Sequence, residues 1–146
     1  GHAFTSNKDS NILSTLDIDT IIQCDYLTVH PEENLSKLVD LTSHSNQVVF
    51  AVVNNERELV GIVHFNDIRE IIFNTYRVKY TLIKDVMKTP AATISSYDSM
   101  EIVMSKFEKS KTAFLPVIRN EKYYGFISKS IALEAYRMNL RSMTIE

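Results

Sequence analysis

Glycine is scarce in this sequence: apart from the first residue, the 146-residue chain contains only Gly61 and Gly125. Phosphate-binding loops need several glycines close together, so a Walker loop and a dinucleotide-binding fingerprint are both excluded. A residue used this sparingly marks points where the backbone bends or is closely approached. Both glycines stand in short apolar segments, and each is followed by two more apolar residues and then by polar ones. These two turns are therefore the first candidates for a functional site.

Cysteine is scarcer still, because Cys24 is the only one. A single cysteine excludes an internal disulfide and a multi-cysteine zinc cluster, and it fits a reducing compartment. The histidines share no metal-ligand spacing; they are His2, His30, His44 and His64. No serine or cysteine stands in a nucleophile-elbow sequence. We therefore expect no metal, no cofactor and no catalysis.

Long hydrophobic runs and an excess of charge are also missing. The longest strictly apolar run, 48–53, is far shorter than the ~20 residues that a membrane-spanning helix needs. A net charge of -2 with a pI near 6.1 excludes a strong basic field, so we expect no nucleic-acid partner. The chain is 45% hydrophobic and 23% charged, which is the balance of a soluble globular protein.

The sequence consists of two copies of one unit. Sliding it by 65 residues places Ile18 on Ile83, and Thr28-Val29 on Thr93-Ile94. The apolar positions then stay in register, with Leu35 on Met100, Leu38 on Val103, Val39 on Met104, and 50–53 on 115–118. After one deletion in a hairpin loop, Gly61 falls on Gly125. A unit of this size buries its sheet poorly alone, so we expect the two copies to pack sheet to sheet.

Each copy predicts the element order β-α-β-β-α. Copy one has predicted strands at 28–29, 48–53 and 59–63, a helix at 32–42, and a second helix capped by Asn66 and Asp67. Copy two has predicted strands at 93–94, 114–118 and 123–127, with helices at 98–109 and 130–138. Short helices at 16–22 and 82–87 precede the copies. The predicted organisation is a linker or cloning remnant at 1–15, repeat one at 16–73, a connector at 74–81, repeat two at 82–138 and a tail at 139–146.

This α+β pattern resembles a tandem pair of CBS (cystathionine-β-synthase) domains, the Bateman-type module, over residues 16–138. The motifs that carry the resemblance are Val86-Met87, Leu115-Pro116-Val117, and the turn from Gly61 to Asp67. The sequence of copy two, from Met100-Glu101-Ile102 to Phe126-Ile127-Ser128, is similar to that of the cytoplasmic regions of prokaryotic CLC-type chloride channels and transporters.

The resemblance implies an adenine nucleotide (ATP, ADP or AMP) bound in clefts between the copies. In such pairs the aspartate of the turn accepts hydrogen bonds from the ribose hydroxyls, and a nearby Ser or Thr binds the phosphate. Residues at the strand starts of the other copy enclose the base. Copy one supplies Asp67 but has His64 where a hydroxyl is usual, and a charged histidine would meet phosphate better at lower pH. Copy two supplies Ser128 but has Ile131 in place of the acid.

We therefore expect one good cleft and one poor one. The good cleft is built on Asp67 with its neighbours, and its expected lining is His64, Asn66, Ala92, Thr93, Phe114 and Pro116. The cleft beside Ser128 lacks an acidic residue that could bind the ribose, and we expect it to be empty or filled by side chains. The alternative for Asp67 is a simple helix cap.

The function implied by the resemblance is a regulatory module, not an enzyme, on the cytosolic face of the membrane. It would serve a chloride channel or transporter and couple dimer geometry to transport. The implied partners are a second molecule in a homodimer, favoured by apolar helix stripes at 35–41 and 100–107, and the transport domain of its own parent chain. Two alternatives stay open: a ligand-free structural or dimerisation module, and a regulatory CBS fragment of a metabolic enzyme.

Overall fold

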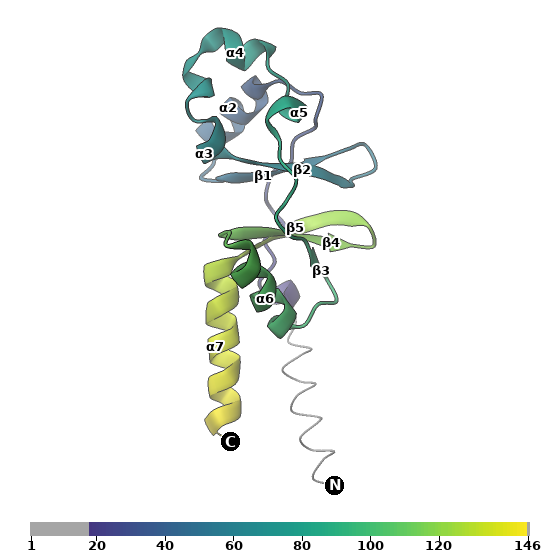
Figure 1. The fold of residues 1–146 in the computed structure, drawn as a ribbon, viewed down its shortest axis with the longest axis vertical. Coiled ribbons are helices and arrows are strands. Elements are labelled where there is room, and N and C mark those ends of the chain that lie inside the picture. The colour runs from purple at the N-terminus through teal and green to yellow at the C-terminus, as the bar shows by residue number, and fades with distance from the viewer. Residues whose placement is uncertain (1–17, 146) are drawn as a thin grey trace. The chain divides into compact units, whose positions relative to one another are not determined.

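The computed structural model describes residues 18–145, with side chains through residue 140 (Figure 1). The predicted 1–15 segment and the start of the first short helix lie outside the described residues. The chain divides into two compact units. The first-copy unit contains Asp25–Pro90 and Ile118–Tyr124, and the described part of the second-copy unit contains 18–24, Ala91–Val117 and 125–145.

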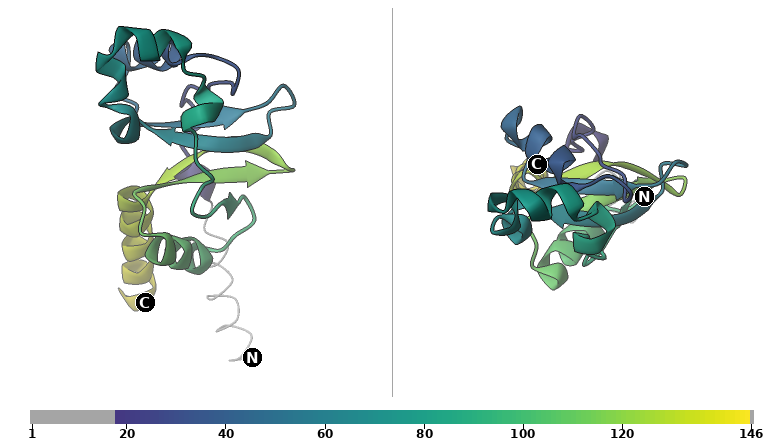
Figure 2. Two further views of the ribbon diagram at one scale, coloured as in Figure 1. Left: turned by 45° about the horizontal axis from the view of Figure 1, so that its top comes forward. Right: turned by 90° about the horizontal axis from the view of Figure 1, so that it is seen from above.

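The first-copy unit is built on an antiparallel hairpin of β1 (Val49–Val53) and β2 (Leu59–His64). Its register pairs Val49 with His64 and Ala51 with Ile62. The helices are α2 (Leu35–Ser43), α3 (Phe65–Ile68), η2 (Ile71–Phe73), α4 (Thr75–Tyr80) and α5 (Ile83–Val86). Figures 1 and 2 show these helices on one side of the hairpin. The other side of the hairpin is therefore left uncovered by this unit's own helices.

Apolar residues at helical and strand spacing form the core of this unit. The cluster contains Val29, Leu35, Leu38, Phe50, Val52, Val63, Ile68 and Ile83, each at most 2% exposed. Burying one such side chain contributes about 1.5–3 kcal/mol. Helix α2 begins after Asn34, whose side-chain oxygen accepts a hydrogen bond from the N–H of Ser36 at 3.1 Å. This cap is why the helix begins at residue 35 and not at the predicted residue 32.

The second-copy unit has a three-stranded sheet in the order β3-β4-β5. Its elements are η1 (Ile18–Thr20), β3 (Ile94–Ser95), α6 (Met100–Ser110), most of β4 (Phe114–Arg119) and β5 (Lys122–Ser128), and α7 (Lys129–Ile145). The tip of the β4–β5 hairpin, Ile118–Tyr124, is the part that belongs to the first-copy unit. Helices α6 and α7 lie side by side against the sheet (Figure 2). Met100, Val103 and Phe107 of α6 are fully buried, as their helical spacing predicts.

A short segment pairs with one strand in each unit. Ile62 of β2 exchanges two backbone hydrogen bonds with Lys88, both 2.8 Å long, and Phe126 of β5 exchanges two with Gln23, at 2.7 and 3.1 Å. Each crossing passes over the glycine before the paired residue, Gly61 or Gly125. The two glycines are therefore required for close approach of another segment, as their scarcity predicted.

Three element predictions need correction. Val29 forms only an isolated parallel bridge to Val52, so 28–29 is not a strand. The connector at 74–81 contains helix α4, which β-branched and aromatic residues conceal in the sequence and which Asn74 caps by accepting from the N–H of Arg77 at 3.0 Å. Helix α7 continues to Ile145 because no glycine or proline follows its predicted end at residue 138. Within the described residues, no helix is long and apolar enough to span a bilayer.

Candidate functional site

The copy-one turn is the point where β2 runs into α3. His64 is the N-cap of α3, yet its side chain makes no capping hydrogen bond. Asn66 and Asp67 are exposed within the first helical turn. The prediction that these two residues cap the helix is wrong, because the helix begins at Phe65, before either of them. The N–H of Phe65 donates to the carbonyl of Val48 at 2.8 Å. The carboxylate of Asp67 thus has no capping role.

Lys88 is the charged partner of Asp67. The Lys88 Nζ lies 3.3 Å from Asp67 Oδ2, and both side chains are open to solvent, at 67% and 40% exposure respectively. Because Lys88 is also the residue whose backbone pairs with Ile62 of β2, its position relative to the turn is fixed by the sheet. Lys88 was not predicted as a site residue; the signal available in the sequence was its place directly after the Val86-Met87 motif.

The copy-two turn is closed in a different way. Ser128 is only 8% exposed, and its Oγ accepts from the N–H of Ile131 at 3.3 Å and lies 2.9 Å from Ser130 Oγ. Ser128 thus performs the capping that was predicted for Asp67. A pocket of about 360 Å³ lies beside it, lined by Ala113, Phe114, Ser128, Lys129, Ser130 and Leu133.

The residues predicted to enclose a base all belong to the second-copy unit. Thr93 is exposed and its carbonyl accepts a hydrogen bond from Lys106 Nζ at 2.7 Å. Ala92 and Phe114 are half-buried, whereas Pro116 is buried within β4. Asp67, His64 and Asn66 belong to the first-copy unit, so a joint site of the two sets stays a prediction.

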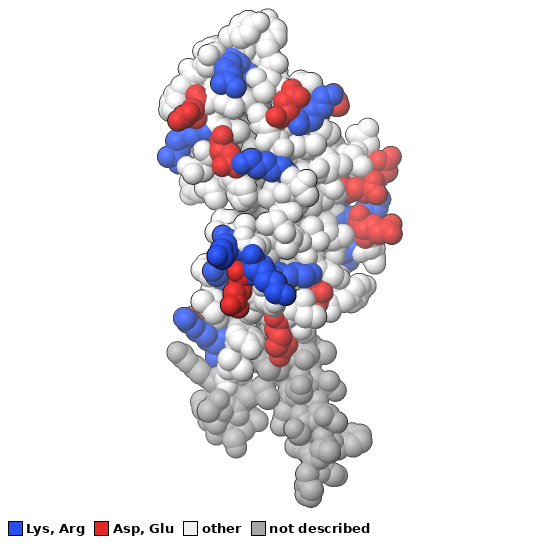
Figure 3. Space-filling model, viewed as in Figure 1, with Lys and Arg blue, Asp and Glu red and all other residues white. Residues whose placement is uncertain are grey.

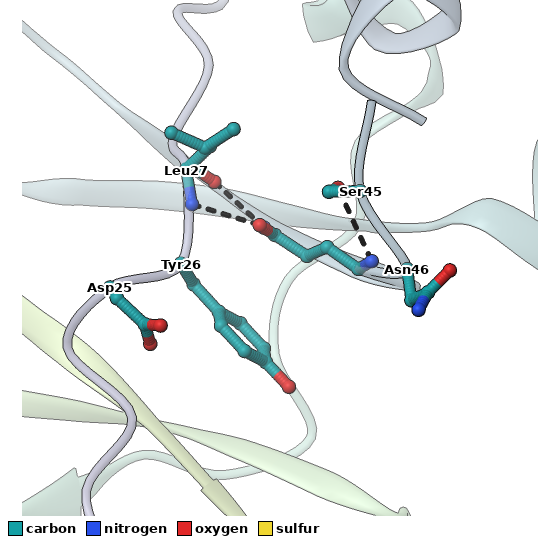
Figure 4. Close-up of a pocket in the computed structure, with 6 residues that line it drawn as sticks. Asp25, Tyr26, Leu27, Ser45 and Asn46 are labelled. Atoms are coloured by element: carbon teal, nitrogen blue, oxygen red, sulfur yellow. Dashed lines mark hydrogen bonds between the residues drawn. The ribbon is translucent and has the colours of Figure 1, made fainter. Parts of the chain in front are cut away.

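A pocket of about 420 Å³ in the first-copy unit was not predicted. It is lined by Asp25, Tyr26, Leu27, Ser45, Asn46 and Gln47, drawn in Figure 4. The Gln47 amide joins its two walls, since Oε1 accepts from the Leu27 N–H at 2.9 Å and Nε2 donates to the Leu27 carbonyl at 2.8 Å. Burial, and secondarily the nearby charge of Asp25, raises the pKa of Tyr26 above its ordinary value.

Charge is mixed on the one face of the molecule that Figure 3 shows in space-filling form. On this face, acidic and basic side chains are interspersed, without a broad field of one sign. Among the described residues, no three His, Cys, Asp or Glu side chains are grouped as a metal site would require. The copy-one turn offers hydrogen-bonding groups and local charges, which are the groups that bind a small polar ligand.

Two α+β units, each with a glycine at the point where another segment crosses its sheet, define a tandem-repeat module. The family model for the CBS domain matches residues 17–74 and again residues 83–137. The chain belongs to the CBS domain family, with two CBS domains in tandem, and the resemblance drawn from the sequence is confirmed at this level.

Curated relatives carry this region as part of longer proteins. The chain is 27% identical over 120 residues to a homoserine O-acetyltransferase of Methanosphaera stadtmanae, a match covering 82% of this chain and 24% of that protein. It is 24% identical over 103 residues to an inosine-5'-monophosphate dehydrogenase of Methanocaldococcus jannaschii, covering 70% of this chain and 20% of that protein. The chain thus spans a quarter or less of the length of these relatives.

Solved structures show the same fold at low identity. The CBS domain of a membrane protein from Sphaerobacter thermophilus has a TM-score of 0.73 at 15% identity, covering 91% of this chain and 95% of the other. CbpB in complex with c-di-AMP has a TM-score of 0.71 at 20% identity, with coverages of 99% and 98%. CBSX2 in complex with AMP has a TM-score of 0.69 at 16% identity, with coverages of 84% and 96%.

Proposed function

We propose that this chain is a non-catalytic regulatory module that binds an adenine nucleotide at the copy-one turn, where Asp67 accepts hydrogen bonds from the ribose hydroxyls. CBS-domain structures that resemble this chain were solved with AMP and with c-di-AMP, which supports the ligand class. The observation that carries the proposal is the exposed Asp67 carboxylate, which follows β2 and has no role in capping α3. A carboxylate in this position can accept from both hydroxyls of a ribose.

The other predicted site residues keep supporting roles in this proposal. His64 and Asn66 flank Asp67 on the same turn. Ala92, Thr93, Phe114 and Pro116 remain the sequence-based candidates for enclosing the base. Ser128 is a poor ligand residue for the second turn, because its hydroxyl is buried and already engaged with the start of α7.

Regulation would follow from differential binding. A nucleotide that prefers one conformation of the module shifts the equilibrium of the parent protein toward it, by no more than the difference in binding free energy. No residue of the module needs to take part in chemistry for this to work.

Thermal unfolding with ATP, ADP or AMP tests the proposal. A ligand present at about ten times its Kd adds about 1.4 kcal/mol to the free energy of unfolding, which raises Tm by about 4 °C in a domain of this size. We expect such a rise with at least one of the three nucleotides, and we expect Asp67→Ala to abolish it.

Asp85→Ala is the matched control, because Asp85 and Asp67 both occupy the third position of a four-residue helix in the same unit. The Asp85 variant should keep the nucleotide-induced rise in Tm. Absence of any rise in the unaltered protein would instead favour the ligand-free structural module.

Self-association is part of the proposal under either reading. Much of the apolar stripe on α2 and on α6 is buried within its own unit, but Val39 of α2 and Ile102 of α6 remain exposed. Large apolar side chains are also exposed on α7, at Ile131, Met138 and Leu140, each 39% exposed or more. We expect a homodimer, which sedimentation velocity at several protein concentrations would detect.

Two parents fit such a module. The sequence of copy two favours a chloride channel or transporter as the parent protein. Such a parent would place the module on the cytosolic face of a membrane. The curated relatives favour a metabolic enzyme, since both reported matches are to enzymes of which this region is a small part. The full-length gene separates the two, because several apolar stretches of ~20 residues would indicate the transporter.

A further inference from the structure

The position of Lys88 is set by the main chain. Its N–H and carbonyl both bond to Ile62 of β2, at 2.8 Å each. The preceding residue, Met87, packs directly over Gly61, where an added Cβ would come within 2.8 Å of the Met87 sulfur. The crossing segment therefore cannot slide along β2, and the Lys88 side chain always starts from the same point relative to the turn.

From this fixed backbone the Lys88 ammonium reaches the carboxylate of Asp67. The separation is 3.3 Å and both groups stay accessible to solvent. An exposed ion pair of this kind contributes little to folding. It does hold a positive charge on a flexible stem directly beside the proposed ribose-binding oxygen atoms.

The second-copy unit lacks both members of this pair. Gln23 occupies the position of Lys88, since it forms the same two-bond bridge with the equivalent strand residue, Phe126. Ile131 occupies the position of Asp67. Lys88 and Asp67 thus occur together in the first-copy unit, and neither is found at the equivalent position of the second-copy unit. This pattern is what a pair of groups that act together would show.

A phosphate at the copy-one turn needs a cation. Helix α3 has only four residues, too few for an appreciable helix dipole at its start. The residue three positions before Asp67 is His64, which has no hydroxyl group. Lys88 is the basic side chain that the structure places in contact with Asp67.

We propose that Lys88 is the phosphate-binding residue of the site at Asp67: it pairs with the carboxylate when the site is empty and moves to the nucleotide phosphate when ribose engages Asp67. This inference rests on the proposed function. It makes the site selective for nucleotides over nucleosides, because only a phosphate gains from the released ammonium group.

Isothermal titration with AMP and with adenosine tests this selectivity. We expect Lys88→Gln to weaken AMP binding about tenfold, the value of one charge-assisted hydrogen bond, and to leave adenosine binding equal or slightly stronger. Lys88→Arg should restore most of the AMP affinity. The control is Lys84→Gln, because Lys84 forms an equally long 3.3 Å ion pair, with Glu32, in the same unit. That variant should bind AMP like the unaltered protein.

The outcomes separate this inference from the proposed function. If the unaltered protein binds AMP but Lys88→Gln weakens AMP and adenosine equally, or weakens neither, the role of Lys88 is wrong while nucleotide binding stands. If the unaltered protein binds neither compound, both proposals are wrong. Unfolding curves of the Lys88 and Lys84 variants should coincide, which excludes a folding defect as the cause of lost affinity.

Discussion

The two copies place a glycine at the same point of the equivalent strand, but the crossing segments meet those glycines differently. At Gly61 the nearest atoms to an added Cβ belong to the Met87 side chain, at 2.8–3.1 Å. At Gly125 they include the backbone carbonyl oxygen of Gln23, at 2.7 Å, and a methyl of Ile22, also at 2.7 Å. A side chain can move aside, whereas a hydrogen-bonded backbone cannot. A side chain added at the glycine would therefore displace a movable side chain in copy one, but a fixed backbone in copy two.

Alanine substitution gives the largest expected difference between the copies. Gly125→Ala should lower the free energy of unfolding by about 2–3 kcal/mol, because the new methyl overlaps a backbone held by two hydrogen bonds to Phe126. Gly61→Ala should cost about 1 kcal/mol or less, since a methionine adapts its rotamers. Urea unfolding at constant pH measures both values.

A double variant sharpens this comparison. Shortening the neighbour with Met87→Ala should make the further change Gly61→Ala less costly. The corresponding Ile22→Ala should not make Gly125→Ala tolerable, because the overlap with the Gln23 carbonyl remains. Equal costs for the two single glycine variants would contradict the distinction between side-chain and backbone contacts.

The hairpin loops also differ between the copies. In copy one, a five-residue loop is held by Asn54, whose Oδ1 accepts from the N–H groups of Glu56 at 3.0 Å and Glu58 at 2.9 Å. Its Nδ2 also donates to the Glu58 carboxylate at 2.9 Å. We expect Asn54→Ala to lower the free energy of unfolding by about 1–1.5 kcal/mol. Asn55→Ala, on the exposed neighbour, is the control and should change unfolding by less than about 0.5 kcal/mol.

Copy two closes its hairpin with two residues instead. Asn120 and Glu121 have φ angles of 51° and 69°, as a type I′ turn requires. Asparagine tolerates this left-handed region, whereas glutamate is penalised there by about 1–2 kcal/mol. Glycine would remove the penalty but costs about 0.5–1 kcal/mol in chain entropy. Glu121→Gly should therefore stabilise by about 0.5 kcal/mol, and Asn120→Gly should be close to neutral; destabilisation by Glu121→Gly in urea unfolding would contradict this account.

The repeat explains how much of the fold could be predicted from the sequence. Strands and long helices follow from apolar spacing, and two equivalent copies confirm one another. Helix α4 could not be predicted, because four of its six residues are β-branched or aromatic. It is held by contacts such as the hydrogen bond from Asn34 Nδ2 to the Lys79 carbonyl at 3.1 Å. Such contacts between residues distant in sequence leave no local pattern.

The candidate site shows the same division between local and distant signals. Asp67 and Ser128 could be found because they stand in a local motif after a glycine. Their actual roles in capping are the reverse of the simplest expectation, since α3 begins at Phe65 and Ser128 bonds to the start of α7. Lys88 could not be assigned at all from the sequence, because its contact with Asp67 exists only once the crossing segment pairs with β2.

The smallest expected effect concerns the pocket at Tyr26, whose equivalent position in copy two is Ala91. Burial raises the pKa of Tyr26 in the folded protein, with a further contribution from Asp25, above the value of about 10 in an unfolded chain. The folded state therefore holds its phenol proton to higher pH than the unfolded state does. The resulting stabilisation is complete below about pH 10 and is lost as the pH rises through the folded-state pKa.

Tyr26→Phe removes this titration. The free energy of unfolding should then fall less steeply with pH above about 10 than in the unaltered protein. Only the difference between the two slopes reports on Tyr26. Tyr97→Phe, at a side chain that is 81% exposed, controls for the loss of a tyrosine as such. If the Tyr26 and Tyr97 variants show the same slope, then the first-copy pocket does not hold the phenol in its neutral form, and the two copies are alike in this respect.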